Sequence, residues 1–176
     1  MHMYRRFTFL PLLLALSLLA GCGMFATNPQ TPARATAPTY DLVAAIRAAG
    51  DREKSVIDVH PLREPGVTSL QDAAQQDEQT GKYADAASKL DQAIRLSPNS
   101  PDLLQERAEI AVRLRDFGAA EKLAHQSWSL GPKLGPLCAR NWQTVVEMRL
   151  QARDVTAAQT ARKWVQQCHK PGVSRY

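Results

Sequence analysis

The stretch Gly81–Pro98, GKYADAASKLDQAIRLSP, predicts the fold of this chain because its pattern recurs further along the sequence. It combines a glycine, an aromatic residue, small residues at helical spacing and a closing proline. Four of its positions have a counterpart at one fixed offset, the period of about 34 residues that one class of helical repeats shows. The pairs are Tyr83 and Phe117, Ala86 and Ala120, Leu90 and Ala124, and Pro98 and Pro132. Self-similarity at one fixed period is typical of a stack of repeated units.

Each residue type in this stretch suits a turn that is followed by a closely packed helix. Gly81 permits the backbone to turn between two helices. Ala86 and Ala93 let two helix backbones approach closely, and Tyr83 fills the space between neighbouring helix pairs. Pro98 follows the helix end, because proline cannot continue the hydrogen-bond ladder.

This order of residues resembles the second half of the tetratricopeptide repeat (TPR), a helix–turn–helix unit. The positions that carry the resemblance are Gly81, Tyr83, Ala86, Leu90, Ala93 and Pro98. The first repeat then spans 67–100, the second 101–134, and the third runs from 135 to about 170. In the third repeat Asp154, Val155 and Ala158 match the second repeat at an offset that is longer by about one helical turn. We therefore expect an all-α, TPR-like stack of two to three repeats over 67–170, with a generic bundle of helical hairpins as the alternative.

The N-terminal segment resembles the signal peptide of a bacterial lipoprotein. Arg5 and Arg6 precede an apolar run, and Leu19–Cys22, LAGC, places small residues and then a cysteine where such a signal ends. The resemblance implies that residues 1–21 are removed and that Cys22 becomes the lipid-modified N-terminus. An uncleaved anchor helix is the alternative. Gly23, rather than an aspartate, follows the cysteine, which by similarity to bacterial sorting signals favours the outer membrane.

A tether and a connector are predicted between this cysteine and the repeats. Residues 22–39 are rich in Pro, Ala and Thr and lack a hydrophobic period, which is typical of a flexible tether. Residues 40–66 begin with a short helix that Gly50 ends, and they continue as an extended connector. Within this connector Val56–Leu62 either covers the first helix pair or lies in the groove of the repeats. Residues 171–176 form a tail.

The charge pattern argues against nucleic acid as a partner. The chain has 22 Lys and Arg against 17 Asp and Glu, and the two signs alternate along the body of the chain. Such alternation is typical of solvated helix faces. After the signal no stretch approaches the ~20 apolar residues that a membrane span needs. The predicted membrane contact is therefore the lipid anchor.

Cys138 and Cys168 are expected to form a disulfide. If lipid modifies Cys22, an even pair of cysteines remains in the oxidising periplasm. Cys138 falls near the start of the first helix of the third repeat and Cys168 near the end of the second, and these ends are neighbours in an antiparallel hairpin. Two buried free thiols are the alternative. With His169 the pair offers too few ligands for structural zinc, so no metal or cofactor is predicted.

The resemblance to TPR proteins also implies a binding surface, because the first helix of each repeat lines the concave face. The residues expected there are polar and rich in glutamine, which suits hydrogen bonds to an extended peptide or a helix. They are Gln71, Gln75, Glu78, Gln105, Glu109, Arg113, Arg140, Gln143 and Glu147. A merely hydrophilic surface is the alternative.

Together these features favour an outer-membrane-anchored periplasmic adaptor that binds another envelope protein or peptide through its repeats. The histidines and carboxylates match no catalytic motif, so no catalytic residues are predicted. Two other functions stay open. One is an envelope assembly factor, pilotin-like or secretion-associated, and the other is a small envelope hydrolase.

Overall fold

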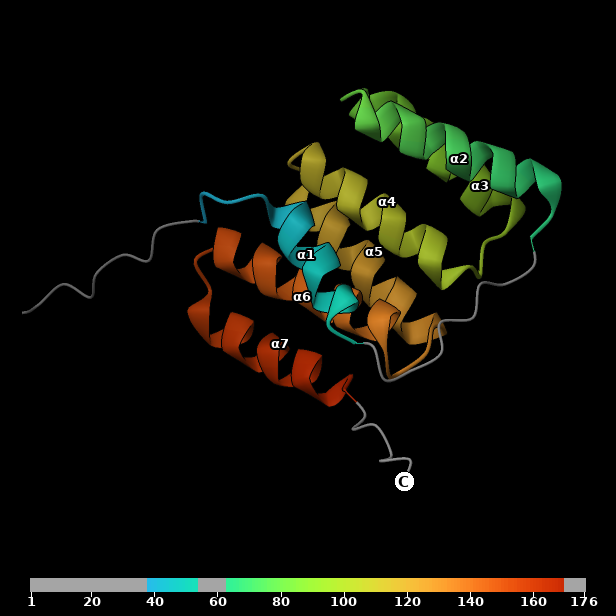
Figure 1. Cartoon of the computed structure of the whole chain (residues 1–176). Helices are drawn as coiled ribbons and strands as arrows, with labels where there is room; N and C mark the ends of the chain where they lie inside the picture. The colour runs from blue at the N-terminus through green and yellow to red at the C-terminus, as the bar shows by residue number, and fades with distance from the viewer. Residues whose placement is uncertain (1–37, 54–62, 170–176) are drawn as a thin grey trace, which may run out of the picture. The chain divides into compact units, whose positions relative to one another are not determined.

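The computed structural model describes residues 38–53 and 63–169, and every regular element in these residues is an α-helix. The helices are α1 (Leu42–Asp51), α2 (Pro65–Gln79), α3 (Tyr83–Leu96), α4 (Pro101–Arg113), α5 (Phe117–Leu130), α6 (Pro136–Gln151) and α7 (Val155–Gln167). The all-α prediction is thus confirmed (Figure 1). A search of the described residues for a helix with the length and hydropathy of a membrane span found none.

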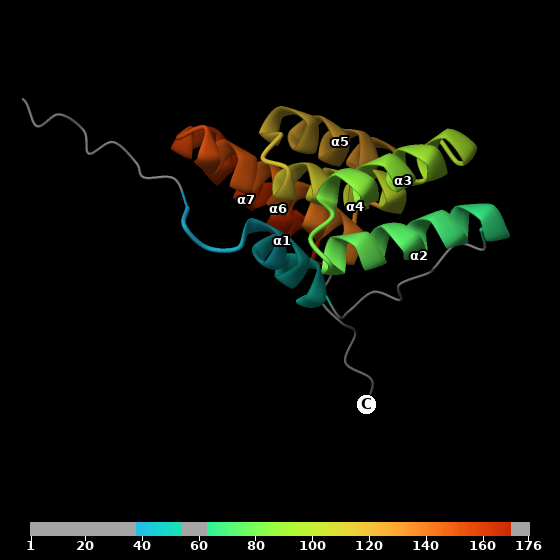
Figure 2. The same ribbon diagram turned by 90° about the horizontal axis from the view of Figure 1, so that it is seen from above.

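The six helices after α1 form three consecutive pairs. α2 packs on α3, α4 on α5, and α6 on α7 (Figures 1 and 2). Neighbouring pairs touch through α3 with α4 and through α5 with α6. The first helix of each pair opens with a proline, where the missing N–H costs no hydrogen bond. The second helices begin at Tyr83, Phe117 and Val155, so they follow the two repeat offsets found in the sequence.

The turn inside each pair has one backbone conformation in all three pairs. Gly81, Arg115 and Arg153 occupy it with φ angles of 76°, 62° and 61°. The next residue then donates its amide to a carbonyl five residues back, as Lys82 does to Asp77 at 2.8 Å. This bond closes a Schellman motif, which satisfies the last carbonyls of the first helix. Glycine adopts the left-handed conformation freely, whereas arginine is strained in it.

Alanines bring the second helices close to their neighbours. Ala86, Ala93, Ala120 and Ala124 are all fully buried. Tyr83 packs against the apolar core of the first pair. These positions are the ones that the repeat pattern marks as packing residues, so the pattern reflects burial along each second helix.

α1 packs against α6 and α4, on the side of the stack that the first helices form (Figure 2). Its Val43 and Ile46 are fully buried and share a core cluster with Met148 of α6. Gly50 lies inside α1 and does not end it, which corrects the sequence-based expectation. A Cβ on Gly50 would lie 2.9 Å from Cγ of Arg140 and 3.2 Å from a backbone oxygen of α6. Glycine therefore allows α1 to approach α6 this closely.

The start of α6 and the end of α7 are joined covalently. Cys138 and Cys168 form a disulfide between residues 30 positions apart, with 5.6 Å between their Cα atoms. The amide of Gly135 also donates to the carbonyl of Cys168 at 2.8 Å. Beside this junction three tryptophans, one each from α5, α6 and α7, pack with ring centroids 5.2–6.2 Å apart. They are Trp128, Trp142 and Trp164.

Several predicted segments lie outside the described residues. They are the signal segment 1–21, Cys22, the tether up to residue 37, the Val56–Leu62 segment and the tail 171–176. The expectations made for them stay predictions.

Replacing Gly81 by alanine should lower the free energy of unfolding by about 1 kcal/mol. A Cβ at this position meets no atom within 4 Å, so the cost comes from the φ angle of 76°. The control is Gly66→Ala in the first turn of α2, where the space is equally open and the backbone is helical. The control should be neutral or stabilise by up to about 1 kcal/mol. Urea unfolding followed by circular dichroism measures both, and equal effects would contradict the turn geometry.

The double variant Cys138→Ser, Cys168→Ser should lose roughly 3–4 kcal/mol of unfolding free energy. The reason is that the bridge closes a loop between residues 30 positions apart and so restricts the unfolded chain. Reductant should destabilise the wild-type chain by a similar amount and leave the double variant unchanged. If the variant loses less than about 1 kcal/mol, the bridge does not hold the third pair together.

Candidate partner-binding groove

The nine side chains that the sequence assigns to a binding surface lie on α2, α4 and α6, three on each helix. We call the side of the stack that these helices form the first-helix face. Side-chain bonds join its helices, since Gln105 donates to Thr144 at 2.9 Å and Arg140 donates to Glu109 at 2.6 Å. Six of the nine residues form two rows that follow the two repeat offsets. One row is Gln71, Gln105 and Gln143, and the other is Gln75, Glu109 and Glu147.

α1 covers the part of the first-helix face that α4 and α6 form. Gln105 and Glu109 are 0% exposed and Glu147 is 1% exposed, although the sequence predicts that they face a partner. The reason is that the apolar side of α1 packs down on these two helices. For Glu109 and Glu147, Arg47 and Tyr40 of the same chain stand where an external partner was expected, and Gln105 bonds to Glu109 and Thr144.

Glu109 is a buried carboxylate at the centre of a network of ion pairs with two partly exposed arginines. One carboxylate oxygen accepts from Nε of Arg47 at 2.8 Å. The other accepts from Nη2 of Arg140 at 2.6 Å and from the amide of Gln105 at 3.0 Å. A carboxylate removed from water stays charged only where ion pairs and hydrogen bonds replace its hydration. Because the two arginines come from α1 and α6, the network joins three helices.

Arg47 also reaches from α1 to α2. Its Nη2 donates to both carboxylate oxygens of Glu78, at 2.9 and 2.8 Å. Burial by itself would lower the pKa of this guanidinium, but Glu109 and Glu78 outweigh burial and raise the pKa. The charged side chain is therefore held firmly between the two carboxylates.

A second group of contacts fixes the N-terminal end of α1. The hydroxyl of Tyr40 donates to Glu147 at 2.6 Å, and burial together with Glu147 raises the pKa of Tyr40 to about 12. Asp41 caps α1 by accepting the amide of Ala44, and it also accepts from Arg113 at 3.0 Å. The Ala44 bond foremost, aided by Arg113 and opposed by burial, lowers the pKa of Asp41. The start of α1 and its middle, through Arg47, are thus both tied to the first-helix face.

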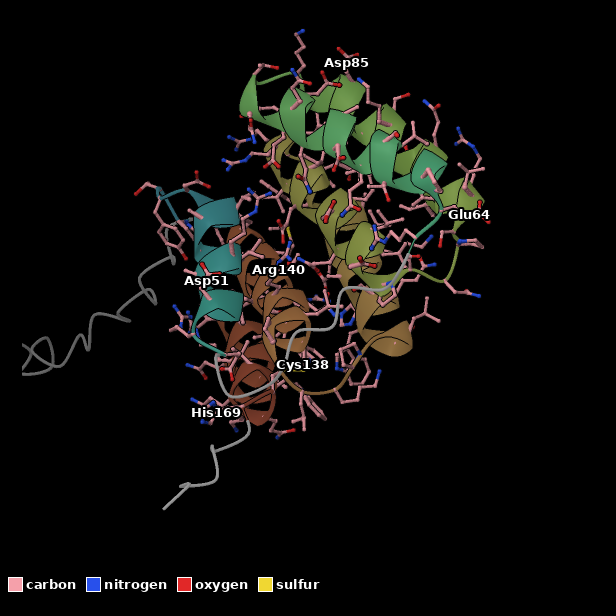
Figure 3. All side chains as sticks on the ribbon, turned by 45° about the vertical axis from the view of Figure 1, so that its right-hand side comes forward. Asp51, Glu64, Asp85, Cys138, Arg140 and His169 are labelled. Atoms are coloured by element: carbon pink, nitrogen blue, oxygen red, sulfur yellow. A yellow bond between two sulfur atoms is a disulfide. The ribbon has the colours of Figure 1, made fainter. Side chains whose placement is uncertain are left out.

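The described residues leave a groove of about 530 Å³ between α1, α2 and α4. We call it the α2–α4 groove. Its buried lining is apolar and includes Ala74, Leu90 and Ile110. Its charged lining residues are Arg47, Asp51, Glu78, Glu106, Arg113 and Arg140. Figure 3 labels two of them, Asp51 on α1 and Arg140 on the neighbouring α6.

The arginines that line the α2–α4 groove are all paired, but two of its carboxylates are not. Within the described residues, neither Asp51 nor Glu106 forms a salt bridge, whereas Glu78 pairs with Arg47. Glu106 accepts one hydrogen bond, from Gln71 at 2.6 Å. Burial, aided by the charge of Glu109, raises the pKa of Glu106, and the Gln71 bond together with the charges of Arg140 and Arg63 offsets only part of that effect. A partly buried carboxylate that lines a groove and forms no salt bridge with the described residues is a candidate for contact with a ligand.

Sequence reasoning missed two features of this site. It predicted the short helix of residues 40–49 but gave it no place in the fold. The one available signal is its run of small residues, Ala48–Gly50, which indicates close packing on another helix. It also missed Glu106, because the positions counted along the first helix of a TPR repeat skip this residue.

Replacing Glu109 by glutamine should lower the free energy of unfolding by about 3 kcal/mol, because Arg140 then has no salt-bridge partner among the described residues and Arg47 keeps only Glu78. The matched control is Asp91→Asn, which removes the partner of Arg107 at a site where the aspartate side chain is 46% exposed. This control should cost less than about 1 kcal/mol. Urea unfolding measures both variants. Similar losses in the two would show that the Glu109 network adds no more than a surface pair.

No protein-family model matches this chain, and no curated protein matches it. Among solved structures, the chain is similar to the globular C-terminal domain of LpoP from P. aeruginosa. The TM-score is 0.56 and the sequence identity is 26%, and the match covers 60% of this chain and 99% of that domain. The two therefore share a helical fold. The likeness supports the interpretation of this chain as a lipoprotein-like protein of the bacterial envelope.

Proposed function

We propose that this chain is an outer-membrane lipoprotein whose helical domain regulates peptidoglycan synthesis by binding another envelope protein in the periplasm. The observation that carries the proposal is the likeness to the LpoP domain, which extends over nearly all of that domain. The cysteine at the end of the signal-like segment supports the same location independently. In this proposal the chain acts by binding and catalyses no reaction itself.

The domain in this proposal is a TPR-like array. Three consecutive helix pairs, each with a left-handed residue in its turn, support that arrangement. The spacing of the second helices supports it too, since a fixed period is typical of stacked repeats. Such an array offers a long, rigid surface built from its first helices. That surface suits recognition of a segment of another protein.

The anchor and the tether set where this surface works. In the proposal Cys22 carries two or three acyl chains, because one chain gives only marginal membrane binding. The tether of residues 22–39 then has an upper reach of roughly 50 Å, at ~3.1 Å per residue for a proline-rich segment. The helical domain would therefore meet its partner in the periplasm, away from the membrane surface.

A fluorescent D-amino acid that is incorporated into peptidoglycan tests the function in cells. Cells without this chain should incorporate the label more slowly, and the wild-type chain should restore the rate. The Cys22→Ser chain should fail to restore it, because the serine cannot carry the lipid. The control Thr27→Ser changes the tether alone and should restore the rate fully.

Two outcomes of this experiment count against the proposal. An unchanged rate in cells without the chain would remove the role in peptidoglycan synthesis and favour a different assembly function. Full restoration by Cys22→Ser would remove the lipid anchor from the mechanism. Mass spectrometry of the mature wild-type N-terminus checks the acylation directly.

A further inference from the structure

α1 shows what the first-helix face accepts, which is a short amphipathic helix that carries one cation. Val43 and Ile46 enter the apolar core between the helices, and Arg47 pairs with Glu109. α1 thereby covers the surface between α4 and α6. The surface between α2 and α4 belongs to the same face, and there the described residues leave the α2–α4 groove open.

The two rows of polar residues show how the surface between α4 and α6, which α1 covers, differs from the α2–α4 groove. In the second row, Glu109 and Glu147 lie under α1 and are held by its side chains and by Tyr40 just before it. On α2 the same row holds Gln75, which is exposed. In the α2–α4 groove, a carboxylate is supplied by Glu106 of α4 instead. An acidic side chain is therefore present in both places, but Glu106 forms no salt bridge with the described residues, although the charges of Arg140 and Arg63 lower its pKa.

Among the described residues that line the α2–α4 groove, the ionisable side chains without a salt bridge are acidic. Arg47 and Arg113 pair with Glu78, and Arg140 pairs with the buried carboxylate of Glu109. Among the described residues, the side chains of the groove that form no salt bridge are Asp51 on α1 and Glu106 on α4. A positively charged group could pair with one of these carboxylates, whereas an anionic ligand would find every arginine that lines the groove already engaged.

We infer that the α2–α4 groove binds an amphipathic helix of the partner protein and that an Arg or Lys of that helix pairs with Glu106. An aliphatic side chain on the same face of the helix would pack on Ala74 and Ile110, as Val43 and Ile46 of α1 pack on the surface between α4 and α6. Asp51 of α1 also lines the groove and adds negative charge to it. This inference rests on the proposed function, because it specifies the segment through which the envelope partner is held.

A phage-displayed library of amphipathic helical peptides, selected on the mature lipidated chain in detergent, tests the inference. The wild-type chain should enrich peptides with Arg or Lys beside an aliphatic position. The Glu106→Arg chain should enrich peptides with Asp or Glu at that place. For one peptide selected on the wild type, Glu106→Gln should weaken binding about tenfold, since a charge-assisted hydrogen bond is lost. Asp72→Asn, an exposed acid of α2 outside the groove, should leave binding unchanged.

Weaker binding by Glu106→Gln should not result from loss of folding. Glu106 makes no ion pair with the described residues of the free chain, so Glu106→Gln should unfold at the same temperature as the wild type or at a higher one. Two results overturn the inference. One is that no peptide is enriched, and the other is that wild type and Glu106→Arg select peptides of the same charge.

The inference about the groove and the proposed function are contradicted by different experiments. If cells without the chain make peptidoglycan normally, the function is wrong whatever peptides the groove selects. If the selection ignores the charge at residue 106 while those cells incorporate label slowly, the function stands and the partner binds elsewhere.

Discussion

The buried carboxylate of Glu109 determines how the described part of this chain is arranged. It is fully buried, so its charge is stabilised only by the groups that surround it. Those groups are Arg47 from α1, Arg140 from α6, and Gln105 one turn away on its own helix. Without α1, Glu109 would lose one guanidinium and the apolar cover above it. The network thus requires that the short first helix lie on the stack, and the same contact defines which part of the first-helix face stays open.

The sequence predicts the regular part of the fold well because that part repeats. The two repeat offsets predict where the second helices begin and which alanines are buried. The disulfide between Cys138 and Cys168 follows from the same topology. Arg115 and Arg153 take the turn position that glycine holds in the first pair, so residue identity alone does not reveal those turns. The repeat offset does reveal them.

The contacts of α1 could not be predicted in the same way. A helix of ten residues carries no repeat that assigns it to a surface, and its apolar side would suit several faces of a helical stack. Without that placement, Gln105, Glu109 and Glu147 look like polar surface residues, and Gly50 looks like a helix end. Once α1 is in place, the carboxylates become buried partners of its basic and hydroxyl groups, and Gly50 becomes a point of close helix contact. The nine predicted residues therefore lie on the first helices, but three of them are buried, and the groove that the described residues leave open lies beside α2.

Hydrogen–deuterium exchange of the intact chain, followed by mass spectrometry, tests the central claim most directly. If the Glu109 network and the apolar seam hold α1 in place, the amides of Leu42–Asp51 should open only when the whole domain unfolds. Their protection should then equal that of α4, and Glu109→Gln should lower both together. If the α1 amides exchange many times faster than those of α4 in the wild-type chain, α1 is not part of the domain core and the account is contradicted.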